Sequence, residues 1–275
     1  MIKVLLVCDF YEPKQIPNEV FSVKKNITLF PISNIPLIEY IMEHLFKNGF
    51  KDVILAGPSY LSILEYLKRT KYYRNMRIES FTNEYQSLGD IMRDIDERDT
   101  RINDLLIYYA NTFVNFDLKE FYKQHINFKK EDKKVICTTV LLNESPEITN
   151  NLYGCDGKNI IYFEQKNRKG DFDIDVRDLN DKYPNLNFLS DKTKPRIFIV
   201  SSEIFSLFTE YFDCKTLEGI ISSLLLLNAY NYKICQIDIS ELPLFVNKIK
   251  KKKTFDLNHV GLGALSFTQG ISGNE

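Results

Sequence analysis

The first 140 residues alternate short apolar runs with stretches in which apolar residues recur every three or four positions. A run such as VLLVC is typical of a strand that is covered on both faces, as in a parallel sheet. The helical spacing is clear in PLIEYIMEHLFKN, where Pro36 suits a first helical turn and Gly49 a C-terminal stop. We expect strands at 4–8, 53–56, 76–81, 105–109 and 135–142, and helices at 36–48, 59–68, 88–97 and 118–125.

This order of strands and helices predicts right-handed crossovers and an α/β fold. The expected architecture is Rossmann-like: a mainly parallel sheet with helices on both faces. Ligands of such folds bind beyond the C-terminal ends of the strands. The positions to inspect for chemistry are therefore those that follow Val7, Ala56 and Tyr109.

The second half of the chain departs from this alternation. Residues 143–194 are polar and rich in turn-forming residues, with one strand expected at 160–163 and a charged excursion at 166–181. Further strands are expected at 196–200 and 232–239, and helices at 203–211 and 216–227. We assign residues 1–245 to one domain, and residues 246–275, first basic and then small and polar, to a C-terminal extension.

Composition narrows the class of protein. Hydrophobic residues make up 44% of the 275 residues, which is enough for a sizeable core, and the net charge of −1 gives no basic field for nucleic acid. Five scattered cysteines without a CxxC pair fit reduced thiols of a cytoplasmic protein rather than a zinc site or a disulfide framework. The apolar runs are too short for a signal peptide or a membrane span, so no membrane is expected.

The segment after the first strand, CDFYEPKQIPNE, contains Asp9 but no glycine. A phosphate-binding turn needs glycines so that backbone N–H groups can approach the anion, and Pro13 and Pro17 remove two such donors. This segment is therefore not expected to hold a phosphate.

The stretch IYYANTFVNF is the second place for chemistry, because Ala110 and Asn111 follow a predicted strand. Magnesium-dependent phosphoryl or nucleotidyl transfer uses carboxylates as metal ligands, whereas Asn111 offers a neutral amide. A turn residue is the favoured interpretation, and no metal site or cofactor is predicted. His44 lies on the apolar side of its helix and is expected in the core; His125 and His259 belong to no catalytic motif.

Three further features allow two interpretations each. Gly89 either approaches a ligand together with Leu88 or permits a tight turn into its helix. Tyr211 and Phe212, between two predicted helices, are either anchors of an interface or plugs of the core, and composition favours plugs. The lysines at 248 and 250–253 form a solvated face or contact an acidic partner or RNA.

Several segments carry a resemblance to known families. LFPISNIPLIEYIMEHLFKNGFKDVIL (29–55) resembles a characteristic segment of the sugar-nucleotide pyrophosphorylases. More narrowly, the chain is similar to the epsilon subunits of eukaryotic translation initiation factor 2B, which carry a pyrophosphorylase-like domain. The segments that match in order are ISNIPLIEY (32–40), SLGDIMRDIDE (87–97), DLLIYYANTFVNF (104–116) and LFTEYFDCKTLEGIISSLLLLN (207–228). The resemblance implies a nucleotidyltransferase-like, pyrophosphorylase-like fold.

The same resemblance implies that the enzymatic site is degenerate. The Pro-Lys pair of active pyrophosphorylases falls on Asn26 and Ile27, and their metal-binding Gly-Asp pair falls on Ala110 and Asn111. The glycines of their first loop are absent. The positions that we assign to this degenerate site are Asp9, Ile27, Leu88, Gly89, Ala110 and Asn111. We expect no nucleotidyl transfer and no catalytic residue.

What the resemblance implies instead is assembly. Epsilon subunits pair with a gamma subunit inside the exchange factor that replaces GDP by GTP on initiation factor 2. The family's Asn-Phe pair, which contacts that factor, falls on Tyr211 and Phe212, so the phenylalanine is kept. The family's β-helix and helical-repeat exchange domain are not expected here, which fits a piece of a longer subunit or a reduced subunit. Two alternatives are an active pyrophosphorylase that uses Lys24 or Lys25, and the gamma subunit of the same complex.

Overall fold

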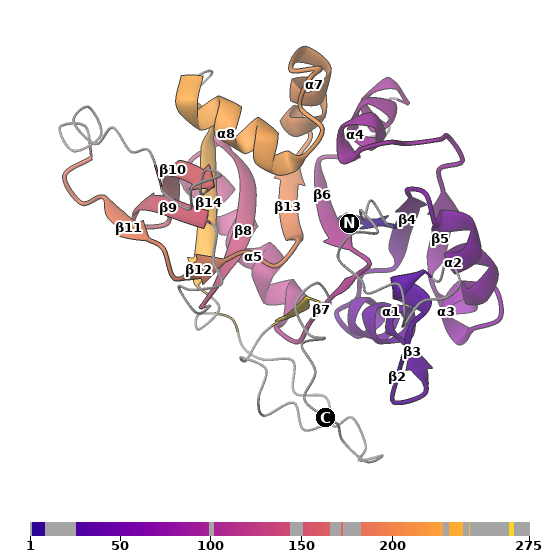
Figure 1. The fold of residues 1–275 in the computed structure, drawn as a ribbon. Helices are drawn as coiled ribbons and strands as arrows, with labels where there is room; N and C mark the ends of the chain where they lie inside the picture. The colour runs from indigo at the N-terminus through magenta and orange to yellow at the C-terminus, as the bar shows by residue number, and fades with distance from the viewer. Residues whose placement is uncertain are drawn as a thin grey trace.

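The computed structural model describes residues 2–8, 26–98, 102–143, 151–165, 172, 183–227, 231–238, 242 and 264–266. These residues fold around one large sheet with the strand order β11-β9-β10-β14-β8-β13-β6-β1-β4-β5, and β12 pairs with β8 beside this path (Figure 1). Most of the charged stretch expected at 166–181 lies outside the described residues, as do Lys248 and Lys250–Lys253. The predicted boundary at residue 245 therefore stays a prediction.

The centre of the sheet is mainly parallel, as predicted. Its strands are β1 (Lys3–Val7), β4 (Asp52–Ala56), β5 (Arg77–Ser80), β6 (Asp104–Tyr109), β8 (Val135–Asn143), β13 (Ile197–Ser201) and β14 (Lys233–Asp238). Of these seven strands, β13 alone runs antiparallel to its neighbours, β6 and β8, and the other six point the same way. The C-terminal ends of six strands therefore meet at one edge.

Helices cover both faces of this sheet, which confirms the second part of the predicted fold. One face packs against α1 (Leu37–Lys47), α2 (Tyr60–Leu67), α3 (Lys71–Asn75) and α5 (Leu118–Glu131), and the other against α4 (Leu88–Glu97), α7 (Glu203–Glu210) and α8 (Leu217–Leu227) (Figure 1). Alternation along β1 divides its side chains: Val4 and Leu6 join the first core, and Leu5 and Val7 the second. The apolar runs of the sequence are thus buried on two sides.

The stretch 143–194 holds more strands than the single one predicted. The hairpin of β9 (Asn151–Asp156) and β10 (Asn159–Gln165) extends the sheet, followed by β11 (Asn187–Leu189) and β12 (Lys192–Thr193). Polar residues and Gly154 interrupt the apolar pattern of β9, so only residues 160–163 of β10 were predicted from the sequence. Other short elements that were not predicted are α3 (Lys71–Asn75), η2 (Ile27–Leu29), β2 (Pro31–Ile32), β3 (Ile35–Pro36), β7 (Thr112–Val114) and β15 (Ala264–Ser266).

One predicted helix end was wrong. Residues 118–125 form only part of α5, which continues to Glu131. The buried face of the helix continues to Phe128, about one turn after His125. The polar residues among and after these positions lie on the side of the helix that faces solvent, and they do not end it. His125 therefore lies inside the helix and is fully buried.

The end of α1 is built as predicted. Gly49 follows the helix with φ +81°, a conformation that favours glycine. His44 is buried in the core, as expected, with Nε2 2.9 Å from the Phe116 carbonyl oxygen, and burial lowers its pKa to about 4. Asn48 joins α1 to α5, because its Nδ2 donates to the His44 carbonyl and its Oδ1 accepts from the Leu118 N–H, each at 2.9 Å.

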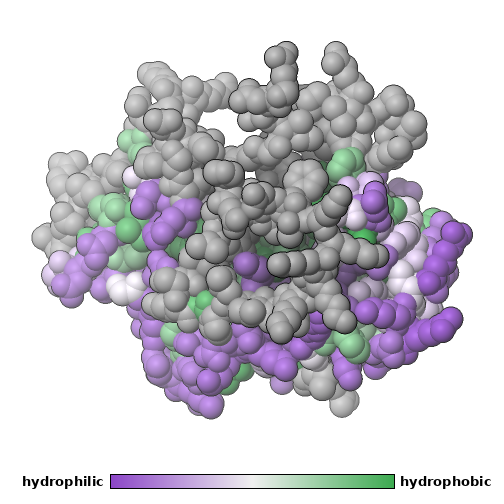
Figure 2. Space-filling model, turned by 90° about the horizontal axis from the view of Figure 1, so that it is seen from below, coloured by the Kyte–Doolittle hydropathy of each residue, from purple (hydrophilic) through white to green (hydrophobic). Residues whose placement is uncertain are grey.

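On the face seen in Figure 2, most of the coloured surface is hydrophilic. Seen from the side of α1, the visible hydrophobic residues lie in small groups between hydrophilic ones (Figure 2). All five cysteines are free thiols, and four of them are buried, as predicted. Within the described residues, no helix has both the length and the apolar character to cross a membrane.

Candidate functional site

The edge at which β1, β4, β6, β8 and β14 end is the expected place for a ligand. Ala110 and Asn111 form a turn there directly after β6, and both are fully buried. The Ala110 N–H donates to the Val7 carbonyl at 3.0 Å, which ties the turn to the end of β1. Asn111 Oδ1 lies 3.2 Å from Thr112 Oγ1, and its Nδ2 has no hydrogen-bond acceptor among the described residues. Asn111 thus lies in a turn directly after the strand, as the sequence predicts.

Ile27 lies in η2, beside α1 and α2, and carries no charge. Its neighbour Asn26 caps this short helix by accepting the Thr28 N–H at 2.9 Å, and it donates to Ser62 Oγ of α2 at 3.3 Å. The two positions aligned above with the Pro-Lys pair of the pyrophosphorylases are thus the cap and the first residue of a short helix. Asp9, Lys24 and Lys25 lie outside the described residues.

A carboxylate at this edge was missed by the sequence analysis. Asp238 ends β14, and Lys192 of β12 places its ammonium 2.9 Å from Asp238 Oδ2 and also donates to Asn143 Oδ1. The signal in the sequence was an acidic residue at the end of a predicted strand. The positive charge of Lys192 balances the negative charge of the Asp238 carboxylate. This carboxylate is therefore already paired with a cationic side chain of the same chain. Within the described ranges, no three His, Cys, Asp or Glu side chains gather as a metal site would require.

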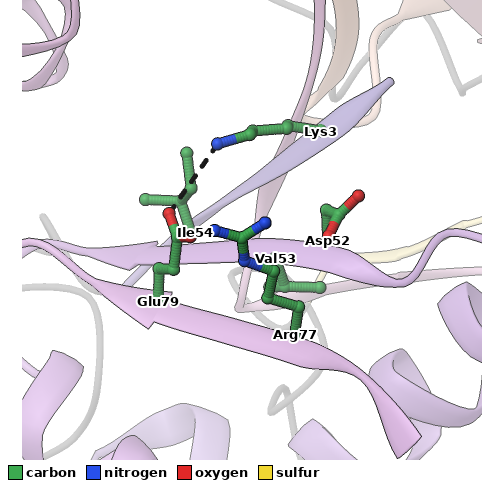
Figure 3. A pocket seen from close by; sticks show the side chains of 6 residues that line it. All are labelled: Lys3, Asp52, Val53, Ile54, Arg77 and Glu79. Atoms are coloured by element: carbon green, nitrogen blue, oxygen red, sulfur yellow. Dashed lines mark ion pairs between the residues drawn. The ribbon is translucent and has the colours of Figure 1, made fainter. Parts of the chain in front are cut away.

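A shallow hollow lies at the opposite ends of β1, β4 and β5 (Figure 3). Lys3 reaches toward Glu79 at 3.7 Å, and Arg77 pairs with the same carboxylate at 2.9 Å, while Asp52 lines the rim. The hollow is too shallow to enclose a water molecule. Arg77 and Glu79 belong to the edge strand β5, and charged side chains on an edge strand discourage pairing with another chain, so these ion pairs fit a charged edge rather than a ligand site.

Gly89 brings the start of α4 against the bend between α7 and α8. Its N–H donates to the Lys215 carbonyl at 3.1 Å, and a Cβ at this position would lie 2.7 Å from the Cys214 carbonyl oxygen. Ser87 and Asp90 form a capping box that fixes this helix start. Gly89 thus allows a close approach of the chain to itself, which is neither of the two roles that the sequence left open, and Leu88 lies in the core beneath it.

Phe212 lies in this bend and is 68% exposed. The guanidinium of Arg93 stacks on its ring at 4.5 Å from the centroid and donates to the carbonyls of Phe208 at 2.9 Å and Phe212 at 3.4 Å. The core-plug interpretation is therefore wrong for Phe212, because Arg93 of a distant segment holds the bend at the surface. Tyr211, in contrast, is half-buried and packs against the core.

Asp90 anchors Arg93 in turn. The Arg93 Nη2 lies 2.8 Å from Asp90 Oδ1. Burial raises the pKa of Asp90, but hydrogen bonds from Arg93 and from the N–H groups of Gln86 and Ser87 outweigh it and lower the pKa. The capping box, the ion pair and the aromatic ring form one rigid chain of contacts.

A further hydrogen bond, from Thr209 Oγ1 to Asp96 Oδ2 at 3.1 Å, joins α7 to α4. We call the surface formed by residues 87–98 and 202–216 the α4–α7 face. The structure thus brings together two of the four segments that carry the narrower resemblance, 87–97 and 207–228. Figure 1 shows α4, α7 and α8 side by side on the upper side of the sheet.

No family model matches the chain. Curated proteins do match, among them the translation initiation factor eIF2B subunit epsilon of Schizosaccharomyces pombe, 25% identical over 246 residues, and its counterpart of Dictyostelium discoideum, 22% identical over 247 residues. The chain resembles eIF2B subunit epsilon. The matches cover 82% and 85% of this chain but 35% and 34% of those proteins, so it spans about a third of their length.

The fold is that of nucleotidyltransferase-like pyrophosphorylases. A Bacillus anthracis protein assigned as a glucose-1-phosphate thymidylyltransferase superposes with a TM-score of 0.60 at 10% identity, over 86% of this chain and 87% of that one. UDP-glucose pyrophosphorylase with bound UDP-glucose gives 0.58 at 13% identity, over 89% and 92%. Both predicted resemblances, to the pyrophosphorylases in fold and to eIF2B subunit epsilon in sequence, are thus confirmed.

Proposed function

We propose that this chain is the nucleotidyltransferase-like part of an epsilon-type subunit of the guanine nucleotide exchange factor for initiation factor 2. In this proposal it acts as a scaffold and as a docking surface and does not transfer nucleotides. The supporting observation is that residues 87–97 and 207–216, from two of the segments that resemble epsilon subunits, meet in one surface around Arg93 and Phe212. Nucleotide exchange itself then requires the assembled complex.

The edge of the sheet supports the noncatalytic part of the proposal. Nucleotidyl transfer needs positive charge at the transferring phosphate and carboxylates that hold a metal ion. Asn111 supplies a buried neutral amide, Ile27 an alkyl side chain, and Asp238 is neutralised by Lys192. We infer that these changes together leave the site degenerate.

Turnover tests this part directly. The purified chain, mixed with a nucleoside triphosphate, glucose 1-phosphate and Mg²⁺, is expected to form no nucleoside diphosphate sugar above the background without protein. The measurement is chromatographic detection of the product for each of the four common nucleotides. Formation of a nucleoside diphosphate sugar that depends on Mg²⁺ would show that the chain is an active pyrophosphorylase. This alternative is considered because proteins of the same fold are such enzymes. In that case Lys24→Ala or Lys25→Ala should abolish protection by nucleotide in a thermal-shift assay.

The partners follow from the epsilon-type proposal. We propose a gamma-type subunit and the other subunits of initiation factor 2B as the assembly, and initiation factor 2 as the GTPase that docks. The setting would be the cytoplasm, without a membrane or direct nucleic-acid contact. The gamma subunit as the identity of this chain has less support, because both curated relatives reported above are epsilon subunits.

Phe212→Ala is expected to weaken binding to initiation factor 2 about tenfold or more and to leave the melting temperature nearly unchanged. An exposed aromatic at the centre of an interface is a frequent site of large binding losses, and its 68% exposure means that little folding energy depends on it. Binding can be measured by interferometry with the immobilised chain.

Leu61→Ala is the matched control for Phe212→Ala. Leu61 is 53% exposed on α2, which packs on the other face of the sheet, and its loss should change neither binding nor stability. Equal binding of wild type and the Phe212 variant would contradict the docking role, whereas loss of folding would contradict the exposed position.

A further inference from the structure

We propose that the α4–α7 face binds a basic segment of its partner, with an arginine side chain stacked on the outer face of the Phe212 ring. The identity of that partner as a translation factor rests on the proposed function. The chemistry of the bound segment rests only on the residues of the face itself.

The first argument is charge. The α4–α7 face contains seven acidic residues and three basic ones, although the whole chain carries a net charge of only −1. Arg93 is paired with Asp90 at 2.8 Å, and Arg98 with Asp94 at 2.9 Å. Five further residues of the face are acidic and one is basic: Asp96, Glu97, Glu203, Glu210 and Asp213, and Lys215. All six are exposed, so this surface attracts cations and repels phosphates and acidic peptides.

The second argument is the geometry at Phe212. Arg93 covers one face of the ring at 4.5 Å from the centroid, and the side chain nevertheless keeps 68% of its surface exposed. The exposed face of the ring carries the negative part of the aromatic quadrupole. A guanidinium is the cation that stacks best there, because it is planar and weakly hydrated.

The third argument is preorganisation. Arg93 donates to two carbonyls of the bend and is itself held by Asp90, whose carboxylate accepts from two backbone N–H groups. Gly89 holds the other side of the bend through the Lys215 carbonyl. A ring that is already fixed in its bound position loses little conformational entropy when a partner docks. The face is thus a rigid acidic surface with one presented aromatic ring.

The test uses the full chain and two fluorescent probe peptides: one that alternates arginine with serine and one that alternates glutamate with serine. Fluorescence anisotropy should show that the arginine peptide binds at low salt, more weakly as salt increases, and that the glutamate peptide does not bind. The double variant Glu97→Gln, Asp213→Asn should weaken binding of the arginine peptide severalfold. Phe212→Leu, which keeps apolar area but removes the ring, should weaken it about twofold to fivefold. Glu65→Gln, at an exposed position of α2 on the other face of the sheet, should leave binding of the arginine peptide unchanged.

The inference is overturned if the arginine peptide does not bind, or if it binds equally well to wild type and to both variants of the face. This failure is distinguishable from failure of the proposed function. Binding of the peptide without binding of initiation factor 2 supports the basic segment and contradicts the proposed partner. Binding of initiation factor 2 that depends on Phe212 but not on Glu97 and Asp213, with no binding of the peptide, contradicts the basic segment alone.

Discussion

Replacing Gly89 by alanine is expected to lower the free energy of unfolding by about 1–3 kcal/mol, because the new Cβ overpacks a closely packed contact. The added Cβ would lie 2.7 Å from the Cys214 carbonyl oxygen and 3.3 Å from the Phe208 ring. A backbone carbonyl cannot rotate away, so α4 and the α7–α8 bend must separate. Alanine favours a helix over glycine by up to about 1 kcal/mol, which offsets part of the loss. Urea unfolding of both proteins measures the difference.

Gly219→Ala is the matched control for Gly89→Ala. Gly219 lies in α8 beside the same bend, and the nearest atom to an added Cβ is Thr216 Oγ1 at 3.4 Å, an ordinary contact. This substitution should therefore leave stability unchanged or increase it by up to about 1 kcal/mol. The Gly89 variant should also bind initiation factor 2 more weakly, because the bend that carries Phe212 is displaced. A Gly89 variant as stable as the Gly219 variant would contradict the close approach described for α4.

Asp104→Asn is expected to cost about 2–3 kcal/mol of stability above pH 4, because it breaks a buried charge cluster. Asp104 is 8% exposed, and its Oδ1 lies 2.7 Å from the Lys129 ammonium and 3.5 Å from His125 Nε2. His125 Nδ1 lies in turn 2.8 Å from Thr138 Oγ1, so the carboxylate completes a fully buried polar chain between β6, α5 and β8. This chain resembles a catalytic triad, but burial leaves it no access to a substrate.

The pH dependence gives a sharper test of the same cluster. Burial raises the pKa of Asp104, but the facing His125 and Lys129 outweigh burial and hold the pKa at about 2. The folded-state pKa is thus below the unfolded value of about 3.9, so the stabilisation is present above pH 4 and is lost as the pH falls toward 2. The difference between wild type and the Asn variant should shrink in that window. His44, with a pKa of about 4, destabilises both proteins alike between about pH 6.5 and 4 and cancels in the difference.

Asp132→Asn is the control for a surface ion pair. Asp132 lies 2.6 Å from the Lys233 ammonium, but the pair is open to solvent and should contribute about 1 kcal/mol or less. Thermal or urea unfolding from pH 7 to pH 2 measures all three proteins. An Asp104 variant that differs from wild type no more than the Asp132 variant, or by the same amount at every pH, would contradict the buried cluster.

The elements with strong local signals were predictable from the sequence. The helix at 88–97 begins and ends as expected, because Ser87 and Asp90 form a capping box before an apolar face of helical period. The reversed direction of β13 was not predictable, since a buried strand reads the same way whichever way it runs. Of the hairpin of β9 and β10, only residues 160–163 of β10 were predicted. Strand β9 was missed because Gly154 and the polar residues at its two ends leave no long apolar run, although residues 152–155 are all buried.

Features of the site that depend on neighbouring residues in the sequence could be predicted. Features that depend on contacts between distant segments could not. Asn111 was correctly interpreted as a turn residue, because the end of a strand is a local feature. The exposure of Phe212 depends on Arg93, and the neutralisation of Asp238 depends on Lys192. The local sequence around each residue does not reveal its partner, because Arg93 and Phe212, like Lys192 and Asp238, come from separate elements of the folded chain.

The account depends most on the proposal that this chain works as a subunit of an exchange factor and not as an enzyme. The most direct test is affinity purification of the tagged chain from the cells that make it, with identification of the bound proteins by mass spectrometry. The account predicts stoichiometric recovery of a gamma-type subunit of initiation factor 2B together with initiation factor 2, with the latter reduced for the Phe212→Ala variant. Recovery of the chain without any translation factor would contradict it.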